Sequence, residues 1–294
     1  MPKKRVVLTG AAGYVAQRML GALRERYEVV CLDAVDKTRD GAPVPGLQVV
    51  DLTHEDRDRY RQHFRGADAV IHCAFVRPPG NRGWKDTSDE RFHAEYANVG
   101  MAYNVYRTAL EEGVRRVLVC SSNHAGDWYE RLWMDEKIEL VTPEMPARSD
   151  NFYGWSKAAY ELLGFVFATG AVDGRKLEIV QWRIGAPRDD DMPKIAPGDT
   201  KAMHRALGSW LSAHDQAQQA ILALDTERIE DMHGVPFLVI YGISGNTHRF
   251  WSLDSARRVL GYQPKDDSQV AFADRLQEIV KAPRAEGRGP RPWE

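Results

Sequence analysis

The sequence predicts an α/β fold, a doubly wound parallel sheet with a small C-terminal cap, on three observations. Through residue 185, short apolar runs rich in Val, Ile and Leu alternate with longer segments of helical periodicity. These runs are almost continuously apolar, as in parallel strands that helices cover on both faces. After residue 185 the alternation breaks, and an acidic, proline-rich segment follows.

The predicted elements follow one another in a regular order. Strands are expected at 5–10, 27–33, 47–52, 68–75, 114–122, 177–185 and 236–243. Helices are expected at 13–26, 54–65, 89–112, 153–169, 213–225 and 253–260. This order favours right-handed strand–helix–strand crossovers in a single sheet.

Composition excludes several classes of protein. An apolar fraction of 43% with 28% charged residues is typical of an ordinary globular chain, and a net charge of −2 gives no reason to expect nucleic acid. No apolar run is as long as a membrane span, and no signal peptide is recognisable, so a cytoplasmic protein without a membrane partner is expected. The cysteines and histidines lack metal-ligand spacing, so no metal site is expected.

A glycine-rich turn lies between the first predicted strand and the first helix, in the segment TGAAGYVA. Gly10 permits a tight turn, and Gly13 allows the backbone to approach a pyrophosphate that the helix N-terminus attracts. Asp33 ends the second strand, 20 residues after Gly13, where a carboxylate binds ribose hydroxyls and repels a 2′-phosphate. The sequence therefore predicts a Rossmann-type fold that prefers NAD, although nearby Lys37 and Arg39 leave NADP open.

Two further positions point to chemistry at the strand ends. Tyr153 and Lys157 are four residues apart at the start of a predicted helix, so their side chains share a face. An ammonium group beside a phenol favours the phenolate, which can accept a proton from a substrate hydroxyl while hydride leaves the same carbon. Ser122, at the end of the fifth strand, would orient the reacting oxygen. Asp51 is a candidate adenine contact, with helix capping as its alternative role.

The motifs TGAAGYV, DL at 51–52, IHCA, NVGMAYNV, VLVCSSN and YGWSK occur in this order across most of the chain. In this the sequence resembles the extended short-chain dehydrogenases/reductases of the NAD-dependent epimerase/dehydratase family. The resemblance implies a catalytic set of Ser122, Tyr153 and Lys157, and a helix asparagine that holds water, at Asn98. It also implies cofactor contacts from Gly10, Gly13, Tyr14, Val15, Asp33, Asp51, Leu52, Ala74, Asn98, Ser121, Tyr153, Lys157 and Ile184.

Within that family, CSSNHAG, YGWSK, WRIGAP, HRALGSWLSAHD, YGISGN and LGYQPKD are similar to stretches of uronate dehydrogenases, which oxidise C1 of a hexuronate. The likeness implies that Arg205 binds the substrate carboxylate, for which a guanidinium fork is suited, unless it is only an exposed helix-start arginine. Arg77, Tyr14 and Ala186 stand where those enzymes have polar groups, which predicts a changed substrate. The substrate contacts implied are Arg77, Ser122, Asn123, His124, Ala186 and Arg205.

The predicted function is an NAD-dependent oxidoreductase that acts on a sugar or sugar acid. A nucleotide-sugar 4-epimerase or dehydratase with tightly bound NAD is the first alternative, and a non-catalytic NAD-binding sensor or scaffold is the second. The resemblance also implies a homodimer, formed through the helices at 89–112 and 153–169. We expect an NAD-binding core at 1–185 with active-site loops at 77–91 and 126–150, a region at 186–281 that is mostly cap, and a flexible tail at 282–294.

Overall fold

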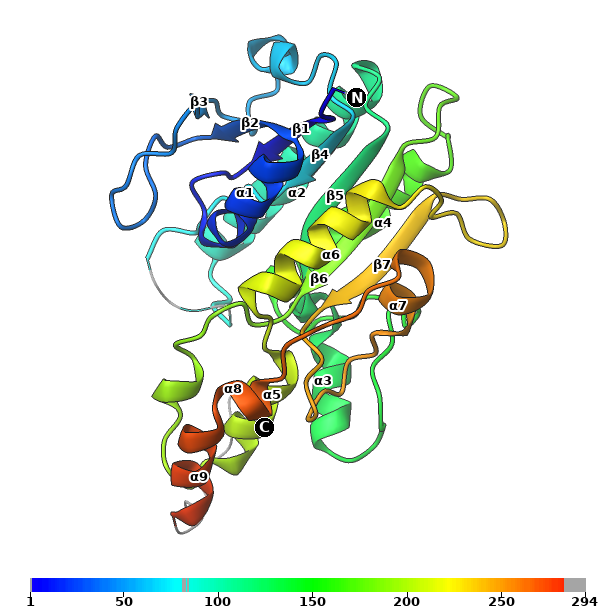
Figure 1. Cartoon of the computed structure of the whole chain (residues 1–294). Coiled ribbons are helices and arrows are strands. Elements are labelled where there is room, and N and C mark those ends of the chain that lie inside the picture. The colour runs from blue at the N-terminus through cyan, green and yellow to red at the C-terminus, as the bar shows by residue number, and fades with distance from the viewer. Residues whose placement is uncertain (1, 81–82, 84, 283–294) are drawn as a thin grey trace.

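Seven parallel strands form one sheet, in the order β3-β2-β1-β4-β5-β6-β7 (Figure 1). The computed structural model describes residues 2–80, 83 and 85–282, so the predicted tail beyond 282 lies outside the described residues. The strands are added outward from β1 through β2 to β3, and the chain then returns to add β4 on the other side of β1. β1 and β4 therefore flank a switch point of the kind at which open α/β sheets bind ligands. The strands are β1 (Arg5–Thr9), β2 (Glu28–Asp33), β3 (Gln48–Val49), β4 (Ala69–His72), β5 (Arg116–Ser122), β6 (Glu178–Ile184) and β7 (Phe237–Gly242).

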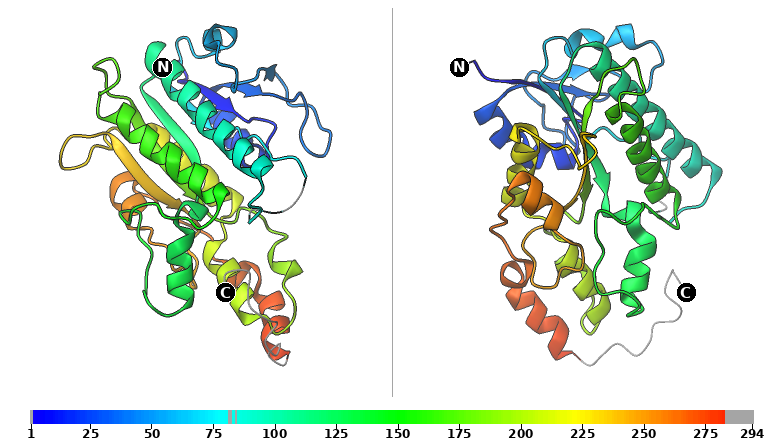
Figure 2. Two further views of the ribbon diagram at one scale, coloured as in Figure 1. Left: turned by 180° about the vertical axis from the view of Figure 1, so that it is seen from behind. Right: turned by 90° about the vertical axis from the view of Figure 1, so that its right-hand side faces the viewer.

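Helices cover both faces of the sheet, as the apolar strands predict (Figure 2). α1 (Tyr14–Arg26), α6 (Ala213–Asp225) and α7 (Asp254–Leu260) lie on one face, and α2 (Asp89–Glu111) and α4 (Phe152–Ala168) lie on the other. Successive residues of β1 alternate between these two cores: Val6 and Leu8 pack with α1 and α6, while Val7 packs with α2. The predicted α/β fold is confirmed.

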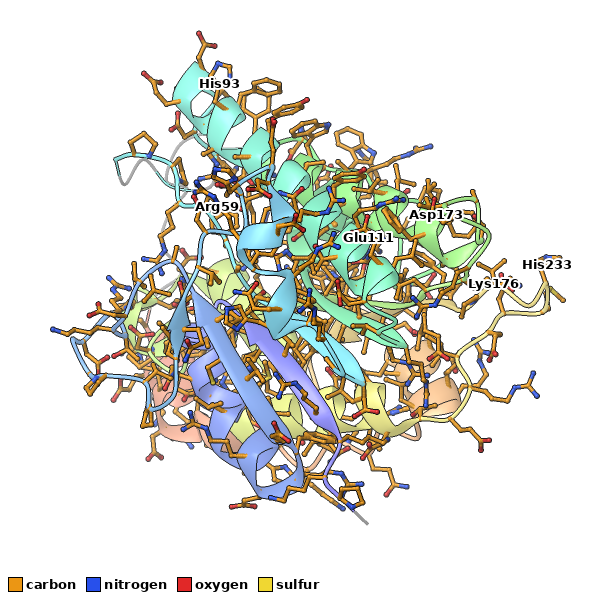
Figure 3. The ribbon with its side chains drawn as sticks, turned by 90° about the horizontal axis from the view of Figure 1, so that it is seen from above. Arg59, His93, Glu111, Asp173, Lys176 and His233 are labelled. Atoms are coloured by element: carbon orange, nitrogen blue, oxygen red, sulfur yellow. The ribbon has the colours of Figure 1, made fainter. Side chains whose placement is uncertain are left out.

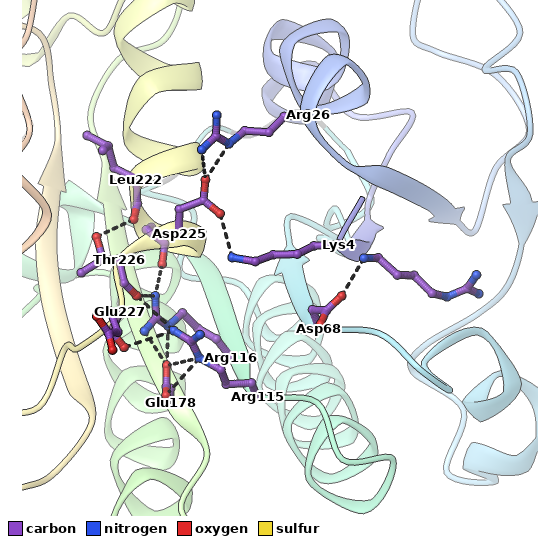
Figure 4. A network of polar contacts seen from close by, with 12 residues as sticks. Lys4, Arg26, Asp68, Arg115, Arg116, Glu178, Leu222, Asp225, Thr226 and Glu227 are labelled. Atoms are coloured by element: carbon purple, nitrogen blue, oxygen red, sulfur yellow. Dashed lines mark hydrogen bonds and ion pairs between the residues drawn. The ribbon is translucent and has the colours of Figure 1, made fainter. Parts of the chain in front are cut away.

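Polar contacts join the amino ends of the strands to the end of α6 (Figure 4). The guanidinium of Arg116, almost fully buried, donates to Glu178 and to the main-chain oxygens of Ala223 and Thr226. Asp225 accepts hydrogen bonds from Lys4 and Arg26. These contacts hold the C-terminal end of α6 against the amino ends of the strands. The candidate site lies at the opposite, carboxyl ends of the strands.

A smaller lobe lies beyond the carboxyl ends of the strands, at the bottom of Figure 1. It contains α3 (Asp127–Met134), the 3-10 turn η4 (Met192–Lys194), α5 (Thr200–Ser209), α8 (Ser268–Ala271) and α9 (Ala273–Lys281). α3 forms inside the segment 126–150 that was expected to be a loop. α6 belongs to the region 186–281, which was expected to be mostly cap, but it packs on the sheet beside α1. There Gln216 donates to the main-chain oxygen of Val15.

The helix predicted at 54–65 is wrong. Two 3-10 turns stand there instead, η1 (Arg57–Arg59) and η2 (Arg61–His63), followed by a short link to β4. Tyr60 and Phe64 are both buried, and their four-residue spacing imitates a helical face. Glu111, at the end of α2, accepts hydrogen bonds from Arg57 and Arg61, and so holds the turns against α2 without a helix. Figure 3 labels Glu111 and, in the first of the two turns, Arg59.

Candidate active site

The glycine turn after β1 lies against the segment that follows β4. Gly10 has a φ of +67°, and a Cβ placed on it would come within 2.5 Å of the main-chain nitrogen of Ala74. The Gly13 N–H donates to the Gly10 oxygen at 2.9 Å, which closes the turn. α1 then begins at Tyr14, and among the described residues no side chain caps this end. The turn and the open helix N-terminus therefore fit the pyrophosphate of a dinucleotide.

Asp33 lies directly beside this turn. Its two carboxylate oxygens accept hydrogen bonds from the main-chain N–H groups of Ala12, at 2.9 Å, and Ala34, at 2.7 Å. The oxygen bound to Ala34 also accepts from the Val35 N–H at 3.4 Å, while the oxygen bound to Ala12 keeps a lone pair for a ribose hydroxyl. The carboxylate therefore fits the cofactor role that its position predicts. Asp51 instead accepts from both the N–H and the hydroxyl of Thr53, which closes a turn rather than capping a helix. Leu52 is buried behind it.

A layer of small polar groups underlies the strand ends. The Thr9 hydroxyl and the Nδ1 atom of His72 are 2.8 Å apart, and both residues are buried. Burial, with a smaller contribution from the charge of Lys157, lowers the pKa of His72 to about 3, so its ring is neutral. The thiol of Cys73, directly after β4, lies next to that of Cys120 on β5, and burial raises the pKa of Cys73.

Tyr153 and Lys157 lie together on one face of α4. α4 is capped by Asn151, whose side-chain oxygen accepts from the Gly154 N–H at 2.9 Å, and this places Tyr153 in the first turn. The Lys157 ammonium donates to the main-chain oxygen of Cys120 at 3.2 Å and lies 5.3 Å from the centre of the Tyr153 ring. Tyr153 is half-buried and Lys157 is buried, an arrangement in which the phenol can reach a ligand while the cation stays in place.

The residues that follow β5 stand next to this pair. Ser122 is buried, and its hydroxyl oxygen accepts from the His124 N–H at 3.2 Å. Asn123 is 2% exposed, and its Nδ2 group has no hydrogen-bond partner within the described part of the chain, so it is available to a ligand. The His124 ring lies 5.4 Å from the Tyr153 ring and pairs through Nδ1 with Asp127 at 2.9 Å.

Three of the implied cofactor residues have side chains that are buried or hydrogen-bonded inside the protein. Asn98 accepts from the N–H of Val76 at 2.7 Å and donates to its oxygen at 3.0 Å, so its amide holds the segment after β4. The Ser121 hydroxyl donates to Glu161 at 2.5 Å, so this hydroxyl is already used inside the protein. Ile184 is buried at the end of β6.

Of the implied substrate residues, Arg205 differs most from expectation. Its guanidinium reaches Glu130 on α3 through Nε and, at 3.3 Å, through a second nitrogen, so that an internal carboxylate takes the place predicted for a substrate. Arg77 is exposed on the segment after β4. Ala186 forms main-chain hydrogen bonds with Ser209 and Leu211, which attaches the start of the small lobe to β6.

Arg91 and Phe75, two residues that contact Tyr153, are not among those predicted from the sequence. The Arg91 guanidinium lies 5.5 Å from the centre of its ring and pairs with buried Glu95 at 2.7 Å. Phe75 meets the ring edge to face, with centres 5.6 Å apart. An Arg–Glu pair spaced i,i+4 in a helix that turns out to be largely buried was the available signal for Arg91, but that spacing is also common on exposed helices.

The sheet order, the glycine turn and the Tyr153–Lys157 pair together are typical of dinucleotide-dependent α/β oxidoreductases. Residues 6–169 match the model of the NAD dependent epimerase/dehydratase family, and the chain belongs to that family. NAD is accordingly its cofactor, with the glycine turn and Asp33 as the residues that fit it.

Curated relatives extend over most of the chain. The L-arabinose 1-dehydrogenase (NAD(P)(+)) of Haloferax volcanii is 30% identical over 90% of this chain and 97% of its own length. The uronate dehydrogenase of Pseudomonas syringae pv. tomato is 30% identical over 92% of this chain and 84% of its own length. The solved glucuronic acid dehydrogenase of Chromohalobacter salexigens has a TM-score of 0.71 at 28% identity, covering 98% of this chain and 92% of that one. The predicted likeness to uronate dehydrogenases is confirmed.

No helix in the described part of the chain is both long and apolar enough to cross a bilayer. The only group of described side chains that could hold a metal ion is His214, Asp215 and Asp266. In it, Asp215 accepts hydrogen bonds from the main-chain N–H groups of Lys265 and Asp266. The group therefore acts as a brace between the start of α6 and the segment after α7.

Proposed function

We propose that this protein oxidises the C1 hydroxyl of a free sugar or sugar acid and passes the hydride to NAD. The observation that carries the proposal is that Tyr153, Lys157 and Ser122 meet at the carboxyl end of β5. Tyr153 also contacts Phe75, in the segment after β4 that the glycine turn approaches. The dehydrogenases of arabinose and of uronates among its relatives support this reaction class.

Each residue has a defined part in the reaction. The unpaired amide of Asn123 and the hydroxyl of Ser122 hold the reacting oxygen of the substrate. Tyr153 accepts the hydroxyl proton as general base. Lys157, fixed by the Cys120 oxygen, stabilises the phenolate and reaches the nicotinamide ribose. NAD, when bound, supplies the hydride acceptor.

The proposal also includes that the protein forms a homodimer and that it lies in the cytoplasm. Exposed apolar side chains gather on α2 and α4, among them Tyr96, Tyr103, Leu162 and Phe165, and support a homodimer formed through these two helices. The three cysteines are free thiols, which supports a reducing, cytoplasmic location.

The reaction is tested by following NADH release with free uronates, neutral aldoses and nucleotide sugars in separate assays. NADH formed with any free sugar or sugar acid, and lost in Tyr153→Phe, is the expected result. Isomerisation of a nucleotide sugar without NADH release would instead establish the epimerase alternative. If the protein binds NAD but turns over none of the three classes, the catalytic proposal is wrong and the sensor alternative stands.

A further inference from the structure

The pairing of Arg205 with Glu130 bears on which sugars the site accepts. Arg205 is on α5 and Glu130 is on α3, so the contact joins two separate segments of the small lobe. The Glu130 side chain is 11% exposed and that of Arg205 is 27% exposed. Both groups are thus largely removed from water, but the guanidinium keeps an accessible edge.

This pair lies at the substrate end of the site. A line of direct contacts leads to it from the catalytic tyrosine: the Tyr153 ring meets His124, and His124 binds Asp127. Glu130 lies one helical turn after Asp127 on α3, so their side chains share a face. A sugar whose C1 hydroxyl reaches Tyr153 would extend its far carbons toward Glu130 and Arg205.

Negative charge dominates around the Arg205 guanidinium. Burial disfavours its charged form, but Glu130, followed by Asp127 and Asp191, more than offsets this and raises the pKa of Arg205, so it stays protonated. Two other cations at this end are similarly placed among acids: Lys85 lies near Asp127, Glu130 and Asp150, although Arg131 is also close to it, and Arg188 lies near Asp191. A substrate carboxylate or phosphate at the accessible edge of Arg205 would lie beside the largely buried Glu130 carboxylate, so two anions would share one cation with little water to screen them.

A hydroxyl group meets no such obstacle. It can donate a hydrogen bond to the Glu130 carboxylate and accept one from an Arg205 N–H group without breaking the ion pair. We propose, building on the proposed dehydrogenase function, that the Glu130–Arg205 pair selects neutral aldoses: it binds the hydroxyls at the far end of the sugar and excludes substrates with an anionic group there.

The test compares three substrates that differ only at C6, namely a hexose, the corresponding hexuronate and the hexose 6-phosphate. The wild-type protein should show a kcat/KM for the hexose at least about tenfold above either anionic sugar, since an unpaired buried charge is strongly discriminated. In Glu130→Gln the freed guanidinium should move the hexuronate-to-hexose ratio of kcat/KM at least about tenfold toward the hexuronate. Glu139→Gln, an exposed acid beyond α3, removes the same charge and should leave the ratio unchanged.

Failures of the two proposals look different. A wild-type protein that prefers the hexuronate or the 6-phosphate would overturn the neutral-sugar inference while upholding the dehydrogenase. NADH formation with none of the three would overturn the dehydrogenase, and the inference with it. The wild-type ratio needs no variant, so the inference stays decidable even if Glu130→Gln does not fold. If Glu130→Gln folds with an unchanged ratio, Glu130 does not select the substrate.

Discussion

Gly10 and Ala74 approach so closely that a single added carbon on Gly10 would overlap the Ala74 main chain, 2.5 Å from its nitrogen. Gly10→Ala must therefore move β1 away from the segment after β4 and distort the turn that fits the pyrophosphate. We expect NAD binding to weaken at least about tenfold, because the glycine turn must bring its backbone close to the pyrophosphate of the cofactor. Isothermal titration with NAD measures the change.

Gly66 provides a matched control. It has the same φ of +67°, but a Cβ there would meet nothing within 4 Å. Gly66→Ala should cost only the left-handed backbone penalty, about 1–2 kcal/mol of unfolding free energy, and should leave NAD affinity as it is. Equal effects of both variants on NAD affinity would show that the contact with Ala74 is unimportant.

Replacing Tyr153 with phenylalanine should remove the proton acceptor and keep the ring contacts with Phe75 and His124. Turnover should fall roughly 10²- to 10⁴-fold, the usual contribution of a general base, with NAD affinity nearly unchanged. Stopped-flow or steady-state NADH assays give the rate. Tyr103→Phe, on the exposed side of α2, should keep full activity. A Tyr153→Phe variant at wild-type rate would contradict the mechanism.

His72 should make the protein less stable in mild acid. Its pKa is about 3 in the folded protein and about 6.5 when unfolded, so protons bind the unfolded chain more readily. The stability it contributes is present above pH 6.5 and is lost as the pH falls toward 3. The contribution of His72 to the unfolding free energy of the protein should be roughly 2 kcal/mol smaller at pH 5 than at pH 7.5.

Urea unfolding at the two pH values checks this contribution. In His72→Asn, which keeps a polar side chain near Thr9, the pH-dependent difference should shrink by that amount. His93→Asn, an exposed position on α2, should behave like the wild type. An unchanged slope in His72→Asn would mean that the ring is not held neutral.

The proposed dimer face can be tested at Leu162, which is 70% exposed on α4. Leu162→Arg places a charge in the middle of that apolar surface and should shift the protein toward monomer, because an interface core tolerates few unpaired charges. Sedimentation velocity measures the change. Val270→Arg, equally exposed on α8, should leave the assembly unchanged. A wild-type monomer would contradict the dimer.

The sheet and its covering helices were predictable because local patterns determine them. Buried strands such as Ala69–His72 are apolar in all but the last residue, and α2 begins where Ser88 caps it and acidic residues follow. The segment around Tyr60 and Phe64 misled prediction because two buried aromatics at helical spacing can also be satisfied by 3-10 turns. Local sequence does not distinguish the two when distant partners, here Glu111, supply the hydrogen bonds.

The parts of the site that could not be predicted also depend on distant partners. Tyr153 and Lys157 are one helical turn apart, so the spacing alone brings them together. Arg205 and Glu130 are 75 residues apart, and their contact depends on how two irregular segments fold over the strand ends. Arg205 was expected to bind a substrate carboxylate, and only the tertiary structure shows that Glu130 of the same chain binds it instead.

Because α6 packs on the sheet beside α1, residues after 185 are part of the same folded unit as the N-terminal strands and helices. Gln219 accepts a hydrogen bond from the indole of Trp182 on β6, while Gln216 donates to the main chain of Val15 in the first turn of α1. A fragment stopped at residue 185 would lose this cover and leave a bare apolar surface beside the nucleotide-binding turn. Attempts to express the dinucleotide half as a stand-alone module should consequently yield aggregates, and any transplant of this catalytic set must carry α6 with it.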